Sequence, residues 1–315
     1  MTGFDWIAQI LGILAALLAA PLFLGWVNQC RAWLQNKSAP PLNQPYRGIR
    51  KLFYKDALIA SNASPLFRLA PYVVFGTMVT AAAVIPSIAT RLPFTRAADA
   101  IALVGLFATA RVFQALAAMD VGTAFGTLGA RREMMIGFLA EPALLMVIFV
   151  ASLISASTAL PAISELLATQ TLALYPSLAF TAVAFTMVLL AENARIPVDN
   201  PATHLELTMI HEALLLEYSA RHLALMEWAA ALKLFNYVCI GFALFIPWGL
   251  ATSQAPFALA IASLLLAAKL VLAGAGIALI EAVSAKLRVF RAPEFLATAF
   301  LFAVLGLLVR LLLGA

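Results

Sequence analysis

Eight long apolar runs follow one another along this 315-residue chain, and they limit its possible folds more than any other feature. A transmembrane helix needs about 20 predominantly apolar residues. The runs approach or exceed that length and nearly fill the sequence, so no soluble domain of ordinary size remains. They are Phe4–Val27, Leu66–Ala89, Ala98–Met119, Met134–Ala156, Thr171–Ala191, Trp228–Leu250, Phe257–Ile280 and Phe295–Leu313.

Composition agrees with a membrane location. The chain is 64% hydrophobic and 11% charged, and a single soluble core could not hide that much apolar surface. No basic stretch precedes the first run and no small-residue cleavage site follows it, so we expect a retained helix and not a signal peptide. The sequence predicts an all-α integral membrane protein with about eight transmembrane helices, forming one polytopic domain over residues 1–315.

The distribution of Lys and Arg predicts the orientation. Most of them fall in the first, third, fifth and seventh connections, whereas the opposite connections have Arg91 and Arg96, with Arg310 near the end. Because cytoplasmic loops carry an excess of Lys and Arg, both termini should lie on the non-cytoplasmic side of a bacterial or archaeal cell (inner) membrane. The net charge of +5 follows from this bias and implies no nucleic-acid partner.

The first cytoplasmic connection, residues 30–65, has an amphipathic segment after Pro45. Its apolar face would comprise Tyr46, Ile49, Leu52, Phe53 and Ala57. This pattern predicts a short helix in the membrane interface. It is either a solvated helix that obeys the positive-inside rule or a docking surface for a cytoplasmic partner. The candidate docking residues here and in the third connection are Arg47, Arg50, Lys51, Lys55, Arg131 and Arg132.

Four ionisable residues lie within the apolar runs, namely Arg111, Glu141, Lys233 and Lys269. Each costs about 2.5–3.5 kcal/mol at the bilayer centre and should face protein or water. Arg111 and Lys269 would lie near mid-span, and Glu141 and Lys233 a turn or two from the cytoplasmic ends. They form either structural ion pairs or a buried polar axis, and the presence of both signs favours the axis.

The connection 192–227 concentrates acidic groups. Close carboxylates cannot all ionise, so some should hold protons near neutral pH, as a proton relay or a redox-linked switch requires. A solvated acidic loop is the alternative. The candidates are Glu192, Asp199, Glu206, Glu212, Glu217 and Glu227, with Arg195 among them.

Asn200 and Pro201 predict a helix start within this connection. On a continuous helix from there, His204, His211 and His222 would share a face. His204 and His211 would be about 10.5 Å apart along the axis, too far for one metal ion. We therefore expect the histidines to form a polar lining and not a zinc site.

Cys30 and Cys239 are far apart, and the chain has no CxxC motif or Cys/His cluster. Any metal redox chemistry should belong to a partner.

Three stretches carry a resemblance that covers essentially the whole chain. They are "NQPYRGIRKLFYKD", "AAMDVGTAFGTLGARREMMIGFLAEPALL" and "AENARIPVDNPATHLELTMIHEALLLEYS". The chain resembles the membrane protein shared by respiratory NADH:quinone oxidoreductase (NADH dehydrogenase) and by membrane-bound [NiFe]-hydrogenases of the formate hydrogenlyase type. "HLELTMIHEA" and "AAMDVGTAFG" look like the hydrogenase form, and the segment from Glu206 to Glu217 is longer than the quinone-site version by about one turn.

The resemblance implies a membrane anchor and proton-coupling subunit, with no catalytic residue and no cofactor or metal of its own. A NiFe centre and iron–sulfur clusters would lie in cytoplasmic hydrogenase large and small subunits and iron–sulfur proteins, and antiporter-like membrane subunits would be further partners. The alternative within the family is the quinone-site subunit of an NADH:quinone oxidoreductase, with quinone as ligand. A free-standing secondary transporter is less favoured, because we find no convincing internal repeat and no pair of corresponding broken helices.

Overall fold

The computed structural model describes residues 3–90, 93–94, 99–169, 175–199, 209–251, 255–287 and 291–313. Within these ranges the chain is mainly helical, and no β-sheet is formed. The helices are α1 (Gly3–Leu34), α2 (Gln44–Phe53), α3 (Pro65–Val84), α4 (Ala100–Asp120), α5 (Ala124–Ser155), α6 (Leu160–Thr169), α7 (Pro176–Glu192), the 3-10 helix η3 (Glu212–Leu214), α8 (Ala220–Phe245), α9 (Pro256–Val283) and α10 (Ala292–Leu313).

The prediction of an all-α membrane protein with about eight long helices is confirmed. Each predicted apolar run corresponds to one helix: α1, α3, α4, α5, α7, α8, α9 and α10. Seven of the described helices are long and apolar enough to cross a membrane, and α7 is shorter, with 17 residues. The sequence did not predict α6, a 10-residue helix in the connection between α5 and α7.

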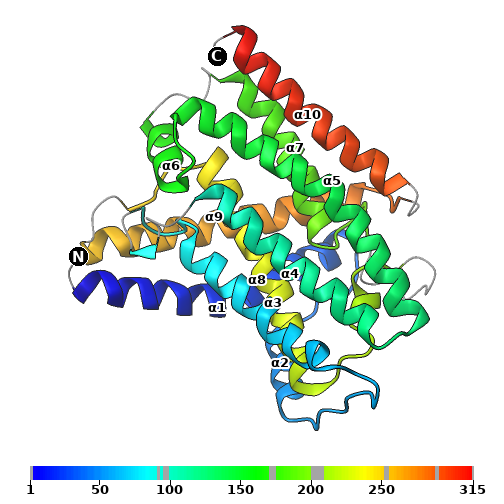
Figure 1. Ribbon diagram of the computed structural model, residues 1–315. Helices are drawn as coiled ribbons and strands as arrows, with labels where there is room; N and C mark the ends of the chain where they lie inside the picture. The colour runs from blue at the N-terminus through cyan, green and yellow to red at the C-terminus, as the bar shows by residue number, and fades with distance from the viewer. Residues whose placement is uncertain are drawn as a thin grey trace.

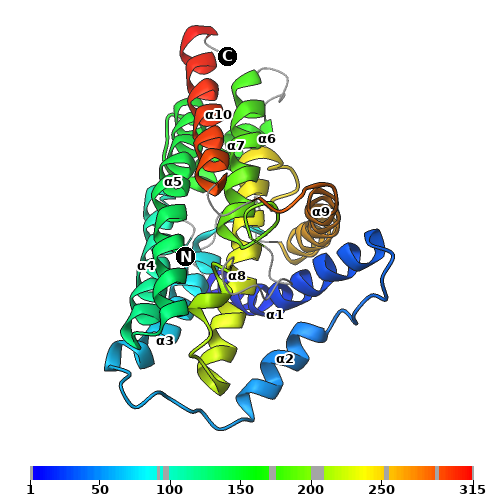
Figure 2. The same cartoon turned by 90° about the vertical axis from the view of Figure 1, so that its right-hand side faces the viewer.

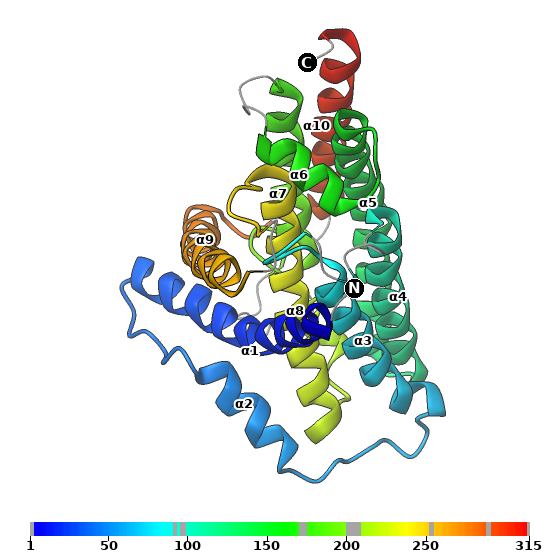
Figure 3. The same ribbon diagram turned by 90° about the vertical axis from the view of Figure 1, so that its left-hand side faces the viewer.

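Helix α8 lies at the centre of the arrangement and packs against α1, α2, α3, α6 and α7. Helices α3, α4, α5, α7 and α10 form a wall on one side of it, and α1 and α9 run side by side on the other (Figures 1 and 2). Figure 3 shows α2 below α1, and α2 packs against both α8 and α1. The buried charged side chains described below come from this wall, from α8 and from α1 and α9.

The odd-numbered connections meet at one end of the bundle. Leu58 and Ser219 exchange two hydrogen bonds, 2.9 and 2.7 Å long, which join the first connection to the fifth. Asn62 donates to the carbonyl of Val121 in the third connection. The Leu287 N–H donates to Pro197 O over 2.8 Å, which joins the seventh connection to the fifth.

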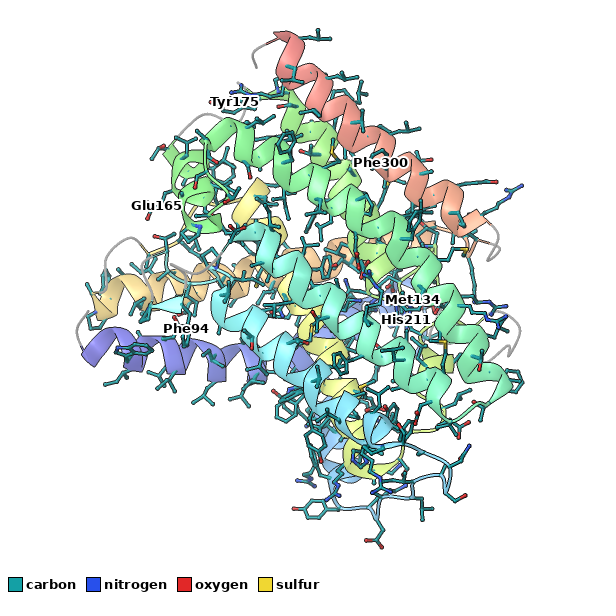
Figure 4. The ribbon with its side chains drawn as sticks, in the orientation of Figure 1. Phe94, Met134, Glu165, Tyr175, His211 and Phe300 are labelled. Carbon is teal, nitrogen blue, oxygen red and sulfur yellow. The ribbon has the colours of Figure 1, made fainter. Side chains whose placement is uncertain are left out.

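The even-numbered connections meet at the opposite end. Ala251 in the sixth connection exchanges backbone hydrogen bonds with Ile88 and Thr90 in the second. In Figure 4, Phe94, Glu165 and Tyr175 lie on the left, and His211 of the fifth connection lies on the right. This alternation is what a chain of eight membrane crossings requires.

Prolines within α1 and α3 leave backbone carbonyls that other helices use. Pro21 and Pro71 have no N–H, so the carbonyls of Leu17 and Phe67 lose their helical donors. The Trp228 Nε1–H donates to Leu17 O over 3.0 Å, and the Tyr218 hydroxyl donates to Phe67 O over 3.0 Å. The Tyr218 ring also stacks on Phe67 with centroids 4.2 Å apart. The first of these contacts anchors α8 to α1. The contacts of Tyr218 anchor the fifth connection, residues 192–227, to α3, and we call this segment the acidic connection.

This arrangement predicts a non-additive pair of substitutions. Tyr218→Phe should destabilise the protein by about 1–3 kcal/mol, because it leaves the buried Phe67 carbonyl without a donor. In a Pro71→Ala background the new N–H restores the helical bond, so the same substitution should cost much less. A double-mutant cycle on detergent-induced unfolding measures the difference. An equal cost of Tyr218→Phe in both backgrounds would contradict the anchoring role of the hydroxyl.

Candidate functional site

Arg111 of α4 lies in the middle of a buried cluster of carboxylates. Its side chain forms ion pairs with Glu133 and Glu141 of α5 and with Glu192, the last residue of α7. The Arg111 Nε to Glu133 Oε1 distance is 3.5 Å. Arg111, Glu133 and Glu192 are almost fully buried, whereas the Glu141 side chain is 34% exposed. One guanidinium thus joins three helices, and its charge stabilises three acidic groups.

The spacing on α5 explains how the helix surrounds this guanidinium. Glu133, Gly137 and Glu141 are four residues apart, and such residues lie on one face of an α-helix. A Cβ atom at Gly137 would overlap the Arg111 guanidinium. The glycine therefore provides the space that lets Arg111 lie between the two carboxylates.

Lys233 of α8 extends the cluster toward the centre of the molecule. Its Nζ lies 2.9 Å from Glu192 Oε2, so Glu192 bonds to one cation from α4 and one from α8. Lys233 is the fourteenth of the 26 residues of α8 and therefore lies near the middle of that helix. The carboxylate at the end of α7 thus links the α4–α5 cluster to α8.

A second branch runs through the acidic connection. His211 Nε2 lies 3.1 Å from Glu133 Oε2, and His211 Nδ1 lies 3.5 Å from Asp199 Oδ2. Lys286 Nζ lies 3.8 Å from the other oxygen of Asp199. Figure 4 shows His211 beside the stretch of α5 that carries Met134, and η3 contacts α5 there. We call the set formed by Arg111, Glu133, Glu141, Glu192, Lys233, His211, Asp199 and Lys286 the charged network.

A separate ion-pair group lies at the same end of the molecule. Glu281 of α9 is 2% exposed and pairs with Arg195 at 3.2 Å and with Arg31 of α1 at 3.6 Å. A tight turn holds Arg195, since its N–H donates to Leu190 O and its carbonyl accepts from Asp199 N. The turn therefore presents Arg195 to α9 and Asp199 to His211.

Two cavities adjoin these groups. The outer cavity, of about 510 Å³, lies between α1, α2, α8 and the acidic connection, and Arg31, Arg195, Glu212 and Glu227 are among its lining residues. The inner cavity, of about 100 Å³, is lined by Arg111, Glu192 and Lys233, among others. The two cavities have five lining residues in common: Asn193, Ala194, His211, Leu215 and Ala230. The charged network thus begins at a cavity wall and continues into the helix bundle.

Several predicted site residues lie outside the charged network. Glu212 begins η3 and lines the outer cavity. Glu227 lines the same cavity opposite Gly48 of α2. Glu217 is half-buried in the turn before α8. Lys269 donates to the carbonyls of Ile246 and Trp248 beyond the end of α8. Ile246 is thirteen residues after Lys233, which is about 20 Å along the helix direction. Glu206 lies outside the described residues.

The predicted docking residues divide into two groups. Arg47, Arg50, Lys51, Lys55 and Arg131 are exposed at the end where the odd-numbered connections meet. Arg132 is partly buried and donates to Met209 O over 2.9 Å. Arg132 therefore holds the acidic connection against α5.

Three details of the sequence prediction are wrong. The fifth connection is not a continuous helix up to His222, because residues 209–219 form a bend, η3 and a turn, and the His211 N–H donates to Asp199 instead of a helical carbonyl. Glu141 and Lys233 lie near the middle of their helices, since α5 and α8 begin ahead of the apolar runs, at Ala124 and Ala220. Ala57 lies beyond the end of α2 at Phe53. The predicted helix start at Asn200 and the position of His204 fall outside the described residues.

Five residues of these groups were not predicted as site residues: Arg31, Glu133, His211, Glu281 and Lys286. Glu133 follows Arg131 and Arg132 in the sequence, so it looked like one more charged residue of the third connection. The four-residue spacing from Glu133 through Gly137 to Glu141 was the signal that could have revealed it. Glu281 lies one residue beyond the seventh apolar run, but α9 continues to Val283 and buries it.

The described residues contain no group of three or more His, Cys, Asp and Glu side chains arranged to hold a metal ion. Cys30 of α1 and Cys239 of α8 are both buried and unpaired.

Comparison with known proteins identifies the family. A family model described as NADH dehydrogenase matches residues 8–312. The chain is 33% identical over 287 residues to formate hydrogenlyase subunit 4 of Escherichia coli (strain K12), covering 91% of this chain and 92% of the relative. It is 36% identical over 234 residues to hydrogenase-4 component C of the same organism, covering 74% and 73%.

A solved structure shares the fold. A chain of the membrane-bound sulfane sulfur reductase, an archaeal respiratory membrane complex, superposes with a TM-score of 0.78 at 17% identity, covering 96% of this chain and 98% of that one. The family match and the two curated relatives each span most of the sequence, and they agree with the resemblance carried by the three connecting stretches. The chain therefore belongs to the NADH dehydrogenase family, and its relatives include formate hydrogenlyase subunit 4.

Proposed function

We propose that this chain is the membrane anchor and proton-coupling subunit of a multisubunit [NiFe]-hydrogenase complex of the formate hydrogenlyase type. The names of the two curated relatives support the type of complex. The observation that carries the coupling role is the charged network, which extends from the wall of the outer cavity to Glu141 near the middle of α5.

Burial of the charged network costs desolvation free energy, which favours a role for these residues beyond helix packing. Each ion removed from water costs several kcal/mol, and apolar residues of similar size stabilise a core at least as well as a buried ion pair does. The network joins α4, α5, α7 and α8 through side chains that can rearrange when one of them gains or loses a proton. A charge change near the outer cavity can therefore alter the ion pairs deep in the bundle.

In this proposal the redox centres belong to partner subunits. The NiFe centre and the iron–sulfur clusters would lie in a cytoplasmic module made of hydrogenase large and small subunits and iron–sulfur proteins. The segments 30–65 and 192–227 would face that module, and the exposed residues Arg47, Arg50, Lys51, Lys55 and Arg131 would bind it. Antiporter-like membrane subunits would receive the electrostatic change and move ions.

The bias of Lys and Arg toward the odd-numbered connections supports a cytoplasmic location for them, with both termini outside. Single cysteines introduced by Ser38→Cys, Thr203→Cys and Ala285→Cys should be shielded from impermeant thiol reagents in intact cells, whereas one introduced by Gln254→Cys should react. Labelling of the Thr203→Cys variant from outside would reverse the orientation and contradict docking of a cytoplasmic module.

The size of the outer cavity favours a second candidate, the quinone-site subunit of an NADH:quinone oxidoreductase. Its volume of about 510 Å³ lies in the range of small-molecule sites, about 300–1,000 Å³. Asn28, Arg31 and Arg195 are polar lining residues that could bind the oxygens of a quinone head group. A bound quinone would accept electrons from a partner's clusters.

One experiment separates the two candidates. The purified complex should evolve hydrogen with a low-potential electron donor, retain no tightly bound quinone and resist quinone-site inhibitors. The segment from Glu206 to Glu217 is longer than in the quinone-site version, and His211, Glu212 and Leu215 within it line the outer cavity, so the added length can remodel a slot for a flat ring. Stoichiometric quinone, together with inhibition that Glu217→Ala relieves, would overturn the hydrogenase assignment in favour of the dehydrogenase.

A further inference from the structure

His211 is the one titratable side chain among the five residues that bound both cavities. The other four are Asn193, Ala194, Leu215 and Ala230. Its side chain is 16% exposed. The outer cavity reaches the surface at Gln44 and Glu227, which are exposed, and the inner cavity contains Arg111, Glu192 and Lys233. A proton that passes from one cavity to the other therefore meets His211 at their shared wall.

The two nitrogens of the imidazole lie near different carboxylates, and neither forms a hydrogen bond within the described residues in this orientation of the ring. Nε2 is 3.1 Å from Glu133 Oε2 on α5, and Nδ1 is 3.5 Å from Asp199 Oδ2 on the acidic connection. The His211 backbone N–H also donates to Asp199 Oδ2 over 3.2 Å, which fixes the distance between that carboxylate and the ring. An imidazole can accept a proton on one nitrogen and release one from the other.

The balance of formal charges in the charged network favours the protonated form of His211. Glu133, Glu141, Glu192 and Asp199 supply four negative charges to the charged network, and Arg111, Lys233 and Lys286 supply three positive ones. The network thus has one uncompensated negative charge when His211 is neutral and none when it is protonated.

Opposing effects act on the His211 pKa. Burial lowers it, and the charge of Lys233 acts in the same direction, but Glu133 and Asp199 outweigh both. The pKa of His211 is therefore raised above its ordinary value. The adjacent Glu212, the Arg132 side chain, which bonds to Met209 O, and Arg195, which lines the outer cavity, are further charged groups near this segment.

We propose that His211 is the proton-transfer residue that connects the outer cavity to the charged network. A proton from the outer cavity binds Nδ1 beside Asp199, and the proton on Nε2 passes to Glu133. The imidazole gains one proton and loses one, so its charge is unchanged after each transfer, and no electron moves. Rotation of the ring restores the starting tautomer. This inference rests on the proposed coupling function, because it assumes that the network takes up protons.

The test uses the complete complex reconstituted in liposomes, with turnover and proton movement measured over a range of pH. His211→Gln should assemble and lower the coupled rate by about 10²-fold, the lower end of the usual effect of a proton-transferring side chain. Added imidazole, which can enter the outer cavity, should restore part of the loss. His222→Gln is the matched control, because His222 is a buried histidine in the first turn of α8 that contacts Tyr72 outside the charged network.

His211→Lys separates proton transfer from charge compensation. The ammonium keeps the positive charge but cannot relay a proton between two nitrogens, so the variant should stay slow and respond little to imidazole. Full activity of the Lys variant, or of the Gln variant, would overturn the assignment of His211. If His211→Gln fails to assemble, His211→Asn provides the same comparison with a smaller side chain.

Glu141→Gln distinguishes failure of this inference from failure of the proposed function. Loss of coupling in the Glu141 variant with full activity in the His211 variants would reject His211 as the entry point and leave the coupling role intact. Full activity and coupling in the Glu141 variant and in the His211 variants would reject both the role of His211 and the proposed coupling function.

Discussion

Arg111→Met is expected to abolish stable assembly of the chain in the membrane, at a cost of about 3–5 kcal/mol. The guanidinium is 4% exposed and pairs with Glu133, Glu141 and Glu192. Methionine fills much of the same volume but leaves three carboxylates with one fewer cation, and Glu133 and Glu192 are too buried to be stabilised by water. The amount of folded chain in membranes and its unfolding temperature in mild detergent measure the effect.

Arg131→Met is the control for this prediction. Arg131 lies near the start of α5 and is exposed, so its loss should change stability by no more than about 0.5 kcal/mol. The triple variant that combines Arg111→Met with Glu133→Gln and Glu192→Gln should recover part of the lost stability, because it removes the uncompensated charges. A stable Arg111→Met protein that needs no such compensation would show that the carboxylates around Arg111 are already protonated.

Glu141→Gln is expected to leave assembly intact and to reduce turnover, or the ion movement linked to it, by about tenfold or more. The amide keeps the shape of the carboxylate but cannot carry its charge or exchange a proton. Glu141 is the most exposed of the three acidic partners of Arg111, and Arg111 retains Glu133 and Glu192 in the variant. Stability should therefore change little while coupling falls.

The matched control is Glu294→Gln, which alters an exposed carboxylate in the first turn of α10. It should change neither assembly nor coupling. Coupling is measured as ion uptake or release per turnover in liposomes. Wild-type coupling in the Glu141→Gln complex would give Glu141 a structural role and would remove it from the proposed path.

The amino-acid sequence by itself determined the membrane fold. Length and hydropathy identify each of the eight long helices, because an apolar run of about 20 residues has few stable alternatives to a spanning helix. The amphipathic pattern after Pro45 likewise predicted α2. The connecting stretches carried the family resemblance that the comparisons confirm. Arg111, Glu141 and Lys233 were also selected, since charged residues within apolar runs are rare, and Glu192 was selected among the carboxylates of the connection 192–227.

Only the tertiary structure decided which charges meet. Lys269 has the same sequence signature as Lys233, yet it bonds to carbonyls beyond the end of α8, whereas Lys233 reaches Glu192. Glu133 and Glu281 lie near the ends of apolar runs and gave no such signal, yet both are 2% exposed and paired. The physical reason is that an ion pair depends on how the two helices are packed and rotated against each other. Hydropathy reports whether a segment enters the membrane, but not which helix lies beside it.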